Sequence, residues 1–278
     1  MAARTSSWFP YLQVAAAAVC WSSGAILIKL ITFSSMETAF LRSFYGGFFL
    51  NLFTRHLPRR ITLPQLIGAA AYAVTSISFI MANKLTLAAN VVLLQHASPV
   101  YVLIMAIFLW RAYPQRGQVA AIILALSGLV LILAGDLSPG GIRGNLLALL
   151  SGLGLAVYVI ALKYDEVGSR LNSTVLGNLM ILVVTIPWAG NVMVPVFDHV
   201  WALLLGLVHF AVPFMLFTWG VRRISALEAS LFKFIEPVLV PIWAGLILGE
   251  GIGSLTITGG VVILAALAVN TISGLSRS

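Results

Sequence analysis

The chain has 278 residues, of which 60% are hydrophobic and only 9% are charged, and its formal net charge is +8. Soluble domains contain about 25% charged residues, so this chain has too few charges to cover the surface of a soluble protein. The composition therefore excludes an ordinary soluble domain and indicates a polytopic membrane protein. In such a protein the positive charge reflects Lys and Arg in cytoplasmic loops, and we expect no nucleic-acid partner.

Apolar stretches of roughly 17–25 residues, the length that a transmembrane helix needs, recur along the whole chain. From the N-terminus onward, helices are predicted at residues 10–31, 38–56, 64–82, 88–110, 117–135, 144–163, 172–190, 200–220, 227–248 and 253–273. The first stretch has no A-x-A-like cleavage site before the second, so we interpret it as a retained helix. No connecting segment is long enough for a soluble domain. We predict an all-α polytopic membrane protein with a single integral membrane domain of ten helices.

Lys and Arg residues at the ends of these helices predict the orientation of the chain. If the N-terminus is cytoplasmic, most basic residues also fall on the cytoplasmic side: Arg4, Arg55, Arg59, Arg60, Arg111, Arg116, Lys163, Arg170, Arg222, Arg223 and Arg277. The opposite side has Lys29, Lys84 and Arg143, and Arg42 and Lys233 lie inside predicted spans. Because basic residues concentrate in cytoplasmic loops, we predict a multi-pass, lipid-embedded protein of the bacterial cytoplasmic (inner) membrane with both termini in the cytoplasm.

Two segments of the first half of the chain align with two segments of the second half. The aligned segments are 85–110 with 223–248 and 10–30 with 144–164. The first alignment superimposes Pro99 on Pro237, and the second superimposes Lys29 on Lys163. The two offsets are nearly equal, which indicates an internal repeat rather than two chance matches.

The alignments divide the chain into two five-helix repeats, residues 1–138 and 139–278. An odd number of helices in each repeat makes the second repeat enter the membrane from the opposite side. Such inverted-topology repeats are typical of secondary transporters, which bind substrate between the two repeats. Two repeats already enclose a cavity, so we expect a monomer.

The ninth predicted helix contains two charges in the sequence FKFIEP at 232–237. Lys233 and Glu236 lie three residues apart and share a helix face, and Pro237 leaves the carbonyl of Lys233 without its helical hydrogen bond. Charges inside a bilayer are costly unless paired or hydrated, and they usually mark substrate or ion pathways. An ammonium beside a carboxylate suits an amino acid zwitterion. The alternative is that both charges are paired and only hold helices together.

Polar and aromatic side chains in other spans complete the predicted substrate site. In the fourth helix, Gln95 and His96 precede Pro99, and an imidazole can bind substrate or carry a proton near neutral pH. We expect Pro99 and Pro237 to act as hinges. The other candidate substrate-binding residues are Trp21, Phe79, Tyr101, Tyr158, His209 and Trp219. For each the alternative is packing between helices, and for the two histidines it is a hydrogen-bonded helix contact.

The sequence predicts neither a metal site nor a cofactor. Its one cysteine, Cys20, excludes an intramolecular disulfide, and its four histidines are widely scattered. The sequence contains no G-x-x-x-x-G-K-[ST] phosphate-binding loop, and no H-E-x-x-H or G-x-S-x-G sequence of a hydrolase. We therefore expect that the protein is not an enzyme and does not hydrolyse ATP.

Three segments carry a resemblance to a known family: WSSGAILIK at 21–29, LTLAANVVLLQHASPVYVLI at 85–104 and ISALEASLFKFIEPVLVPIWAGLILGE at 224–250. On these segments the chain resembles the drug/metabolite transporter superfamily, specifically its ten-helix EamA-type members, and is most similar to bacterial exporters of aromatic amino acids. One position departs from the pattern. The first half has Ala112 where many members carry a Glu, as the second half does at Glu250.

The resemblance implies that the first, third, fourth, sixth, eighth and ninth helices line a central cavity. We therefore predict a secondary transporter that exports amino acids, aromatic and other neutral ones, by alternating access; export is implied by the resemblance alone. A small-drug or organic-cation exporter that uses Glu236 is an alternative, and a non-transporting membrane scaffold is a remote one. Proton coupling through Glu236, His96 or His209 and facilitated diffusion are both compatible with the sequence.

Overall fold

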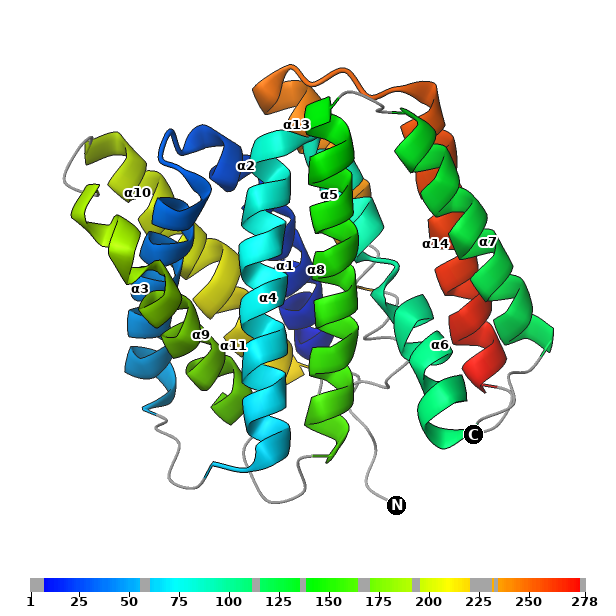
Figure 1. Cartoon of the computed structure of the whole chain (residues 1–278), viewed down its shortest axis with the longest axis horizontal. Coiled ribbons are helices and arrows are strands. Elements are labelled where there is room, and N and C mark those ends of the chain that lie inside the picture. The colour runs from blue at the N-terminus through cyan, green and yellow to red at the C-terminus, as the bar shows by residue number, and fades with distance from the viewer. Residues whose placement is uncertain are drawn as a thin grey trace.

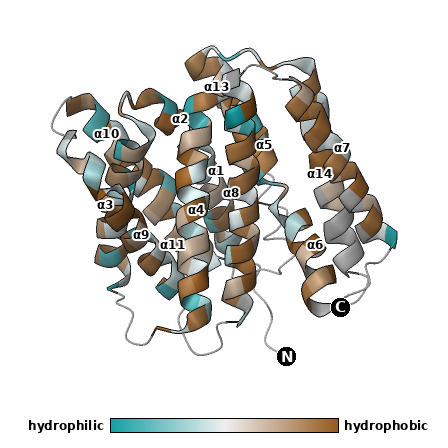
Figure 2. Cartoon of the chain, viewed as in Figure 1, coloured by the Kyte–Doolittle hydropathy of each residue, from teal (hydrophilic) through white to brown (hydrophobic). Residues whose placement is uncertain are grey.

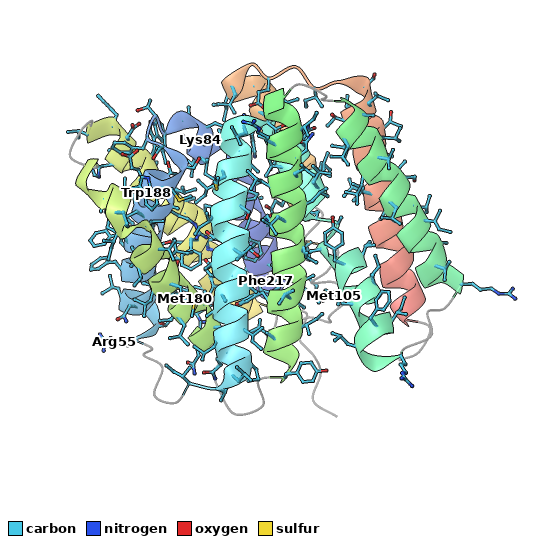
Figure 3. All side chains as sticks on the ribbon, viewed as in Figure 1. Arg55, Lys84, Met105, Met180, Trp188 and Phe217 are labelled. Atoms are coloured by element: carbon cyan, nitrogen blue, oxygen red, sulfur yellow. The ribbon has the colours of Figure 1, made fainter. Side chains whose placement is uncertain are left out.

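A computed structural model of the chain describes residues 8–55, 61–111, 116–135, 139–164, 171–191, 196–220, 232 and 235–275. The secondary structure of these residues is helical throughout, and the long helices run alongside one another between the two ends of the molecule (Figure 1). Lys84 lies at one end and Arg55 lies at the other (Figure 3). We call these the Lys84 end and the Arg55 end.

The first half of the chain forms α1 (Phe9–Ser22), α2 (Gly24–Leu30), α3 (Ser35–Thr54), α4 (Leu63–Leu85), α5 (Ala88–Gln95), α6 (Ser98–Trp110) and α7 (Arg116–Gly135). The second half forms α8 (Pro139–Tyr164), α9 (Leu171–Thr185), the 3-10 turn η1 (Ile186–Asn191), α10 (Val196–Leu204), the π-helical turn η2 (Leu205–Ala211), α11 (Val212–Gly220), α13 (Ile235–Leu248) and α14 (Ser254–Leu275). Each predicted helical range overlaps one or more of these segments.

Six helices in the described part of the chain are long and apolar enough to cross a membrane. They are Phe9–Leu30, Leu63–Leu85, Ala88–Leu109, Gly140–Leu162, Leu171–Gly190 and Val196–Phe217. Shorter apolar helices occur at Ile123–Gly135, Ile235–Leu248 and Ser254–Ala266. The predicted ninth helix is described only at residues 232 and 235–248. These helices identify a membrane-embedded, multi-pass protein.

Several long helices contain interruptions that hydropathy alone did not predict. Ser23 separates α1 from α2, and His96 and Ala97 form a turn between α5 and α6. Pro99 follows in the first turn of α6, where the missing N–H of proline is tolerated because the first helical N–H groups have no intrahelical acceptor. The eighth predicted helix contains the π turn Leu205–Ala211, and π turns within helices are frequent at functional sites.

A capping box determines where α3 begins. The backbone N–H of Glu37 donates to Ser34 Oγ over 3.4 Å, and the backbone N–H of Ser34 donates to Glu37 Oε2 over 2.7 Å. Thr62 and Gln65 form the same reciprocal arrangement at the start of α4. These bonds satisfy N–H groups that a helix otherwise leaves unpaired, which explains why α3 starts at Ser35 rather than at the predicted residue 38.

The surface of the bundle is apolar, and several amides are buried inside it. Phe108 is 81% exposed and Leu246 is 76% exposed, whereas Asn83, Asn90 and Asn145 are fully buried. Hydrophobic residues predominate along the helices in Figure 2. This distribution is suited to lipid, because the lipid-facing surface carries few groups that need water.

Small residues allow the closest helix contacts. A Cβ placed on Gly128 of α7 would lie 2.7 Å from the carbonyl oxygen of Gly259 in α14, and a Cβ on Gly259 would lie 2.6 Å from the carbonyl oxygen of Gly128. A Cβ on Gly154 of α8 would lie 2.6 Å from Thr75 Oγ1 of α4. Such close approaches are typical of helix pairs in membranes, where small residues let the backbones meet.

Candidate substrate site and closing contacts

An acid–base pair lies inside the bundle, between helices that aligned in the sequence. His96 follows α5, and its Nε2 lies 3.5 Å from Oε2 of Glu236 in the first turn of α13. The two side chains are 17% and 14% exposed, so both are largely withdrawn from solvent. The sequence placed Glu236 next to Lys233, and Lys233 lies outside the described residues. The described partner of Glu236 is therefore a histidine from the other half of the chain.

The second ring nitrogen of His96 determines how this pair holds a proton. His96 Nδ1 lies 2.9 Å from the carbonyl oxygen of Val92, and a carbonyl oxygen can only accept, so Nδ1 carries a hydrogen. The contact of Nε2 with the Glu236 carboxyl group is then favourable only if either Nε2 or the carboxyl group carries a hydrogen. Either His96 is a cation beside a carboxylate, or a neutral His96 accepts from a protonated Glu236. A hydrogen bond between the two side chains therefore requires a hydrogen on His96 Nε2 or on the Glu236 carboxyl group.

Gln95 and Tyr101, two of the predicted substrate-binding residues, contact α8. Gln95 Nε2 donates to Ser151 Oγ over 2.7 Å, and Ser151 Oγ donates to the carbonyl oxygen of Thr75 over 2.9 Å. The Tyr101 ring packs so closely on Gly152 that a Cβ there would lie 3.0 Å from it. Both side chains connect the α5–α6 segment to α8.

Trp21, Phe79 and His209 come together where α1, α4 and η2 meet. His209 Nδ1 donates to the carbonyl oxygen of Trp21 over 2.9 Å. The His209 and Phe79 rings are stacked, with centroids 6.3 Å apart and an interplanar angle of 3°. Trp21 also packs on Phe217, with centroids 5.3 Å apart. Gly24 provides the space for the imidazole, because a Cβ there would lie 2.1 Å from the His209 ring.

The structure adds a residue that was not among the predicted site residues. Arg42 of α3 is buried, donating from Nη1 to Ser76 Oγ over 2.6 Å and from Nη2 to Tyr72 Oη over 3.1 Å. Tyr158, a predicted site residue, has its ring centroid 5.7 Å from that of Tyr72. Tyr158 of α8 thus packs on Tyr72 of α4, and Tyr72 in turn contacts Arg42 of α3.

The remaining residues predicted for the site are Trp219 and Pro237. Trp219 is 52% exposed near the end of α11. Pro237 is buried in the first turn of α13, and the proline in the interior of that helix is Pro241, which the sequence analysis did not single out. Trp243 of the same helix donates from Nε1 to Ser22 Oγ of α1 over 3.0 Å. This bond connects the helix of Glu236 to the helix of Trp21.

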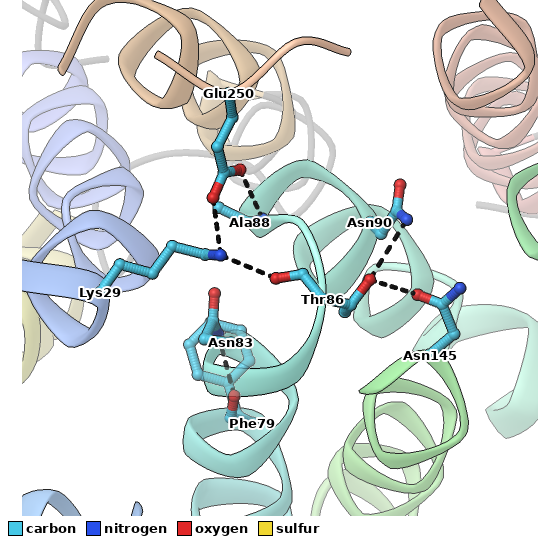
Figure 4. Close-up of polar contacts among 8 residues, drawn as sticks. All are labelled: Lys29, Phe79, Asn83, Thr86, Ala88, Asn90, Asn145 and Glu250. Carbon is cyan, nitrogen blue, oxygen red and sulfur yellow. Dashed lines mark hydrogen bonds and ion pairs between the residues drawn. The ribbon is translucent and has the colours of Figure 1, made fainter. Parts of the chain in front are cut away.

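At the Lys84 end, an ion pair joins the two halves of the chain (Figure 4). Lys29 Nζ lies 2.6 Å from Glu250 Oε1 and also donates to the carbonyl oxygen of Thr86 over 2.8 Å. Glu250 Oε2 accepts from the backbone N–H of Ala88 over 3.0 Å. Gly249 has a φ of +66°, a conformation that other residues rarely adopt, and this turn ends α13 and directs Glu250 toward Lys29.

Buried amides extend this ion pair into a larger polar contact between the halves. Thr86 Oγ1 lies 3.1 Å from Asn145 Oδ1 of α8 and donates to it, and Asn90 Nδ2 donates to Thr86 Oγ1 over 3.5 Å. Thr256 Oγ1 of α14 donates to Asn90 Oδ1 over 3.0 Å. Residues from α8, from the start of α14 and from just after α13 are therefore bound to Thr86 and to the first turn of α5.

A second acidic residue adds another contact at the same end. Asp198 of α10 is buried, and its two carboxylate oxygens each lie 3.1 Å from the backbone N–H of Thr32 and accept from it. The Thr32 hydroxyl donates to Asp198 as well. Lys84 Nζ donates to the carbonyl oxygen of Ile31. The turn between α2 and α3 is thus attached both to α10 and to the end of α4.

The comparisons with known proteins identify the family. A sequence model of the EamA-like transporter family matches the chain twice, at residues 8–134 and 142–272. The chain belongs to the EamA-like transporter family. Members of this family are transporters, and the apolar helices of the chain are suited to a membrane.

Two relatives of this EamA-like transporter cover almost its whole length. A protein of Archaeoglobus fulgidus described as an uncharacterized transporter is 27% identical over 277 residues, which are 94% of this chain and 98% of the relative. A solved crystal structure covers 97% of this chain with a TM-score of 0.62 at 18% identity, and the match spans 98% of that chain. The first likeness supports the transporter assignment, and the second concerns the fold alone.

The polar contacts of this EamA-like transporter at the Lys84 end and around Arg42 were only partly visible in its sequence. Glu250 stood out because the equivalent position of the first half is Ala112. Asp198 gave no comparable signal, because it lies between two predicted spans and its partner is 166 residues away. Arg42 was recognisable as a charge inside a predicted span, but its partners lie on another helix.

Proposed function

We propose that the chain is a secondary transporter that exports amino acids, aromatic and other neutral ones, by alternating access. The observation that carries the proposal is the contact between His96 and Glu236, 3.5 Å apart inside the bundle and contributed by equivalent helices of the two halves. A carboxylate in that position attracts an ammonium group. Aromatic side chains of α1, α4 and η2, which include Trp21 and Phe79, supply apolar surface for a substrate ring.

The proposed architecture is ten membrane-crossing helices in two inverted repeats, residues 1–138 and 139–278. Two matches to one family model, at residues 8–134 and 142–272, support this division. We propose that the Arg55 end faces the cytoplasm, with both termini, because basic residues concentrate there in the sequence. The protein acts as a monomer in the bacterial cytoplasmic membrane, and the Lys84 end faces outward.

In the proposed cycle, the contacts at the Lys84 end close the outer side while substrate arrives from the cytoplasm. The substrate ammonium binds Glu236 and displaces His96, which separates α6 from α13. Release of this contact lets the two repeats rearrange, so that the ion pair of Lys29 with Glu250 opens. The proton of the histidine–glutamate pair either leaves with this exchange or stays on His96, and these two routes correspond to proton coupling and to facilitated diffusion.

Counterflow in proteoliposomes tests the function. Purified protein is reconstituted with unlabelled phenylalanine inside, labelled phenylalanine is added outside, and no ion gradient is imposed. We expect accumulation of label that unlabelled neutral amino acids inhibit and that a quaternary ammonium compound does not. Exchange of the quaternary cation alone would instead support the organic-cation exporter, and exchange of neither class would contradict the transport proposal for these substrates.

The variant Glu236→Gln tests the site. Losing a hydrogen bond to a charged group costs about 1.5–3 kcal/mol, so we expect phenylalanine exchange to fall by about tenfold or more, with normal amounts of folded protein in the membrane. His199→Gln is the matched control, because this histidine contacts Tyr45 Oη over 3.2 Å and the Phe33 ring, at the Lys84 end. Exchange by Glu236→Gln at the wild-type rate would rule out the proposed role of this carboxylate.

A further inference from the structure

The most unusual charge inside the bundle is Arg42, which the proposed transport cycle does not use. Its side chain lies within α3 and the residue is 8% exposed. Its described polar contacts are two neutral hydroxyl groups, those of Ser76 and Tyr72. Among the described residues, no carboxylate lies within ion-pair distance of it. A cation inside a membrane protein is costly unless it is neutralised, so the location of this charge calls for an anion.

Aromatic rings surround the guanidinium group of Arg42. Its Cζ lies 4.7 Å from the centroid of the Phe210 ring and 5.9 Å from that of Tyr72. These distances allow cation–π attraction, which holds the guanidinium plane in a defined place. The rings of Tyr72 and Phe210 are 6.2 Å apart, and Tyr158 lies 5.7 Å beyond Tyr72. A cation over two aromatic rings, with a third ring packed on Tyr72, is suited to a ligand that has both a negative group and an apolar part.

The backbone of this region is built to hold Phe210 over the arginine. Phe210 belongs to the π turn η2, a feature that is frequent at functional sites. A Cβ on Gly46 of α3 would lie 2.6 Å from the Phe210 ring, and a Cβ on Gly206 would lie 2.6 Å from the backbone nitrogen of Gly46. Helix α3 and the π turn therefore meet backbone to backbone. This close approach brings an arginine of the second predicted span into contact with a helix predicted to line the cavity.

We propose that Arg42 binds the carboxylate of the transported amino acid, and that the rings of Tyr72, Tyr158 and Phe210 pack against its side chain. A guanidinium group has five N–H donors arranged for two parallel bonds to a carboxylate. In the arrangement described here, Ser76 and Tyr72 accept two of them as neutral hydroxyl groups. A substrate carboxylate replaces the Ser76 hydroxyl and gains charge-assisted bonds, while Tyr72 stays in place.

This inference rests on the proposed function, and it divides the recognition of a zwitterion between two places. Glu236 attracts the ammonium group, and Arg42 attracts the carboxylate. The inference therefore predicts that a substrate needs a carboxylate in order to be bound tightly. A ligand without a carboxylate should bind weakly even when its ring and amine are unchanged.

The experiment compares phenylalanine, phenylalaninamide, which lacks the carboxylate, and 3-phenylpropionate, which lacks the amine, as competitors of labelled phenylalanine in counterflow. In the wild type we expect phenylalaninamide to compete about tenfold more weakly than phenylalanine, the effect of losing a charged hydrogen-bonding group. In Arg42→Gln, competition by phenylalanine should weaken by about the same factor, and competition by phenylalaninamide should be unchanged. Arg42→Lys, which keeps the charge but loses the two-pronged geometry, should be intermediate.

Controls separate loss of binding from loss of folding. Arg55→Gln is the matched control, because this exposed arginine caps the end of the same helix. This variant should show the same competition pattern as the wild type. The thermal unfolding midpoint of each variant is measured with and without each ligand. If Arg42→Gln does not fold, the wild type still decides, because equal competition by phenylalanine and its amide would overturn the carboxylate site.

The outcomes distinguish this inference from the transport proposal. If the wild type exchanges phenylalanine and both Arg42→Gln and Arg42→Lys do so equally well, the transport function stands. Arg42 would then only link α3, α4 and η2 structurally. A wild type that does not exchange phenylalanine would contradict the proposed function. In that case, thermal stabilisation of the wild type but not of Arg42→Gln by 3-phenylpropionate would still support an anion site, and equal stabilisation would exclude it.

Discussion

In the proposed arrangement of two repeats, the two ends of the bundle correspond to one another in sequence but differ in their charged residues. At the Lys84 end, Lys29 pairs with Glu250 over 2.6 Å. In the sequence alignment of the repeats, Lys29 corresponds to Lys163 and Glu250 corresponds to Ala112. At the aligned positions the sequence therefore retains the lysine but has no acid. The acid of the contact at the Lys84 end thus has no counterpart in the aligned sequence of the first half.

We propose that this difference makes one end of the bundle easier to open than the other. An ion pair that also bonds the backbone at Thr86 and Ala88 makes one end harder to open. We propose that the other end, which lacks this acid in the aligned sequence, opens at a lower free-energy cost. In this proposal, two identical ends would give no preference, and the loss of the acid determines which end is open at rest. The following predictions test this asymmetry, from the largest expected effect to the smallest.

Charge reversal at Glu250 should change the rate of exchange more than any other substitution considered for the two ends. Glu250→Lys places two cations within ion-pair distance and leaves the N–H of Ala88 without its acceptor, so the Lys84 end should not close. Breaking a largely buried pair costs about 3–5 kcal/mol, and we expect phenylalanine counterflow to fall by at least about tenfold. The double variant Lys29→Glu/Glu250→Lys should recover part of this loss; no recovery would show that the pair itself is not what closes this end.

Adding the missing acid at the other end should have an intermediate effect. In the aligned sequences Ala112 corresponds to Glu250 and Lys163 corresponds to Lys29. We propose that Ala112→Glu adds the acid that this second pair of positions lacks, and so makes the two ends more alike. A partly exposed ion pair contributes about 0.2–1 kcal/mol, so exchange should slow by up to about fivefold. Ala112→Gln, which has similar size and no charge, should exchange at the wild-type rate. Equal rates for the Glu and Gln variants would mean that the charge difference between the ends does not control opening.

Removing one hydroxyl from the polar contact should have the smallest effect. Thr256→Val keeps the shape of the side chain but removes the donor to Asn90 Oδ1, a bond of 3.0 Å between α14 and α5. Losing one such bond lowers the free energy of unfolding by about 1 kcal/mol. We expect a slightly lower thermal unfolding midpoint and nearly normal exchange. Thr258→Val, at a threonine that donates only within α14 to Ser254 over 2.9 Å, is the control.

Most of the helices could be predicted from the sequence, because a membrane requires long apolar segments and this chain has few charges to interrupt them. Interruptions of the helices were harder to predict. Pro99 gave a signal for the break that follows α5, but the π turn around His209 lies in an uninterrupted apolar stretch. Backbone geometry of this kind depends on packing, here on Gly24 and Gly46, which leave room for the rings of η2.

The candidate site was harder to predict than the helices, because its contacts join residues far apart in the chain. His96 and Glu236 were both singled out for their chemistry, yet their pairing followed from neither spacing nor the repeat, which aligned Glu236 with Ser98. Sequence distance also hid the partners of Arg42, 30 and 34 residues away on α4. Polar residues inside apolar spans could therefore be found in the sequence, and their partners required the fold.

Distances between spin labels at the two ends test alternating access most directly. Cys20 is first replaced by Ser, and cysteine pairs are introduced at Leu85 with Gly253 for the Lys84 end and at Arg55 with Tyr164 for the Arg55 end, all at exposed positions. Label-to-label distances in reconstituted protein are measured by electron paramagnetic resonance with and without saturating phenylalanine. We predict that phenylalanine lengthens the Leu85–Gly253 distances and shortens the Arg55–Tyr164 distances. Distances at both ends that do not change, in protein that exchanges phenylalanine, would contradict alternating access between the two repeats.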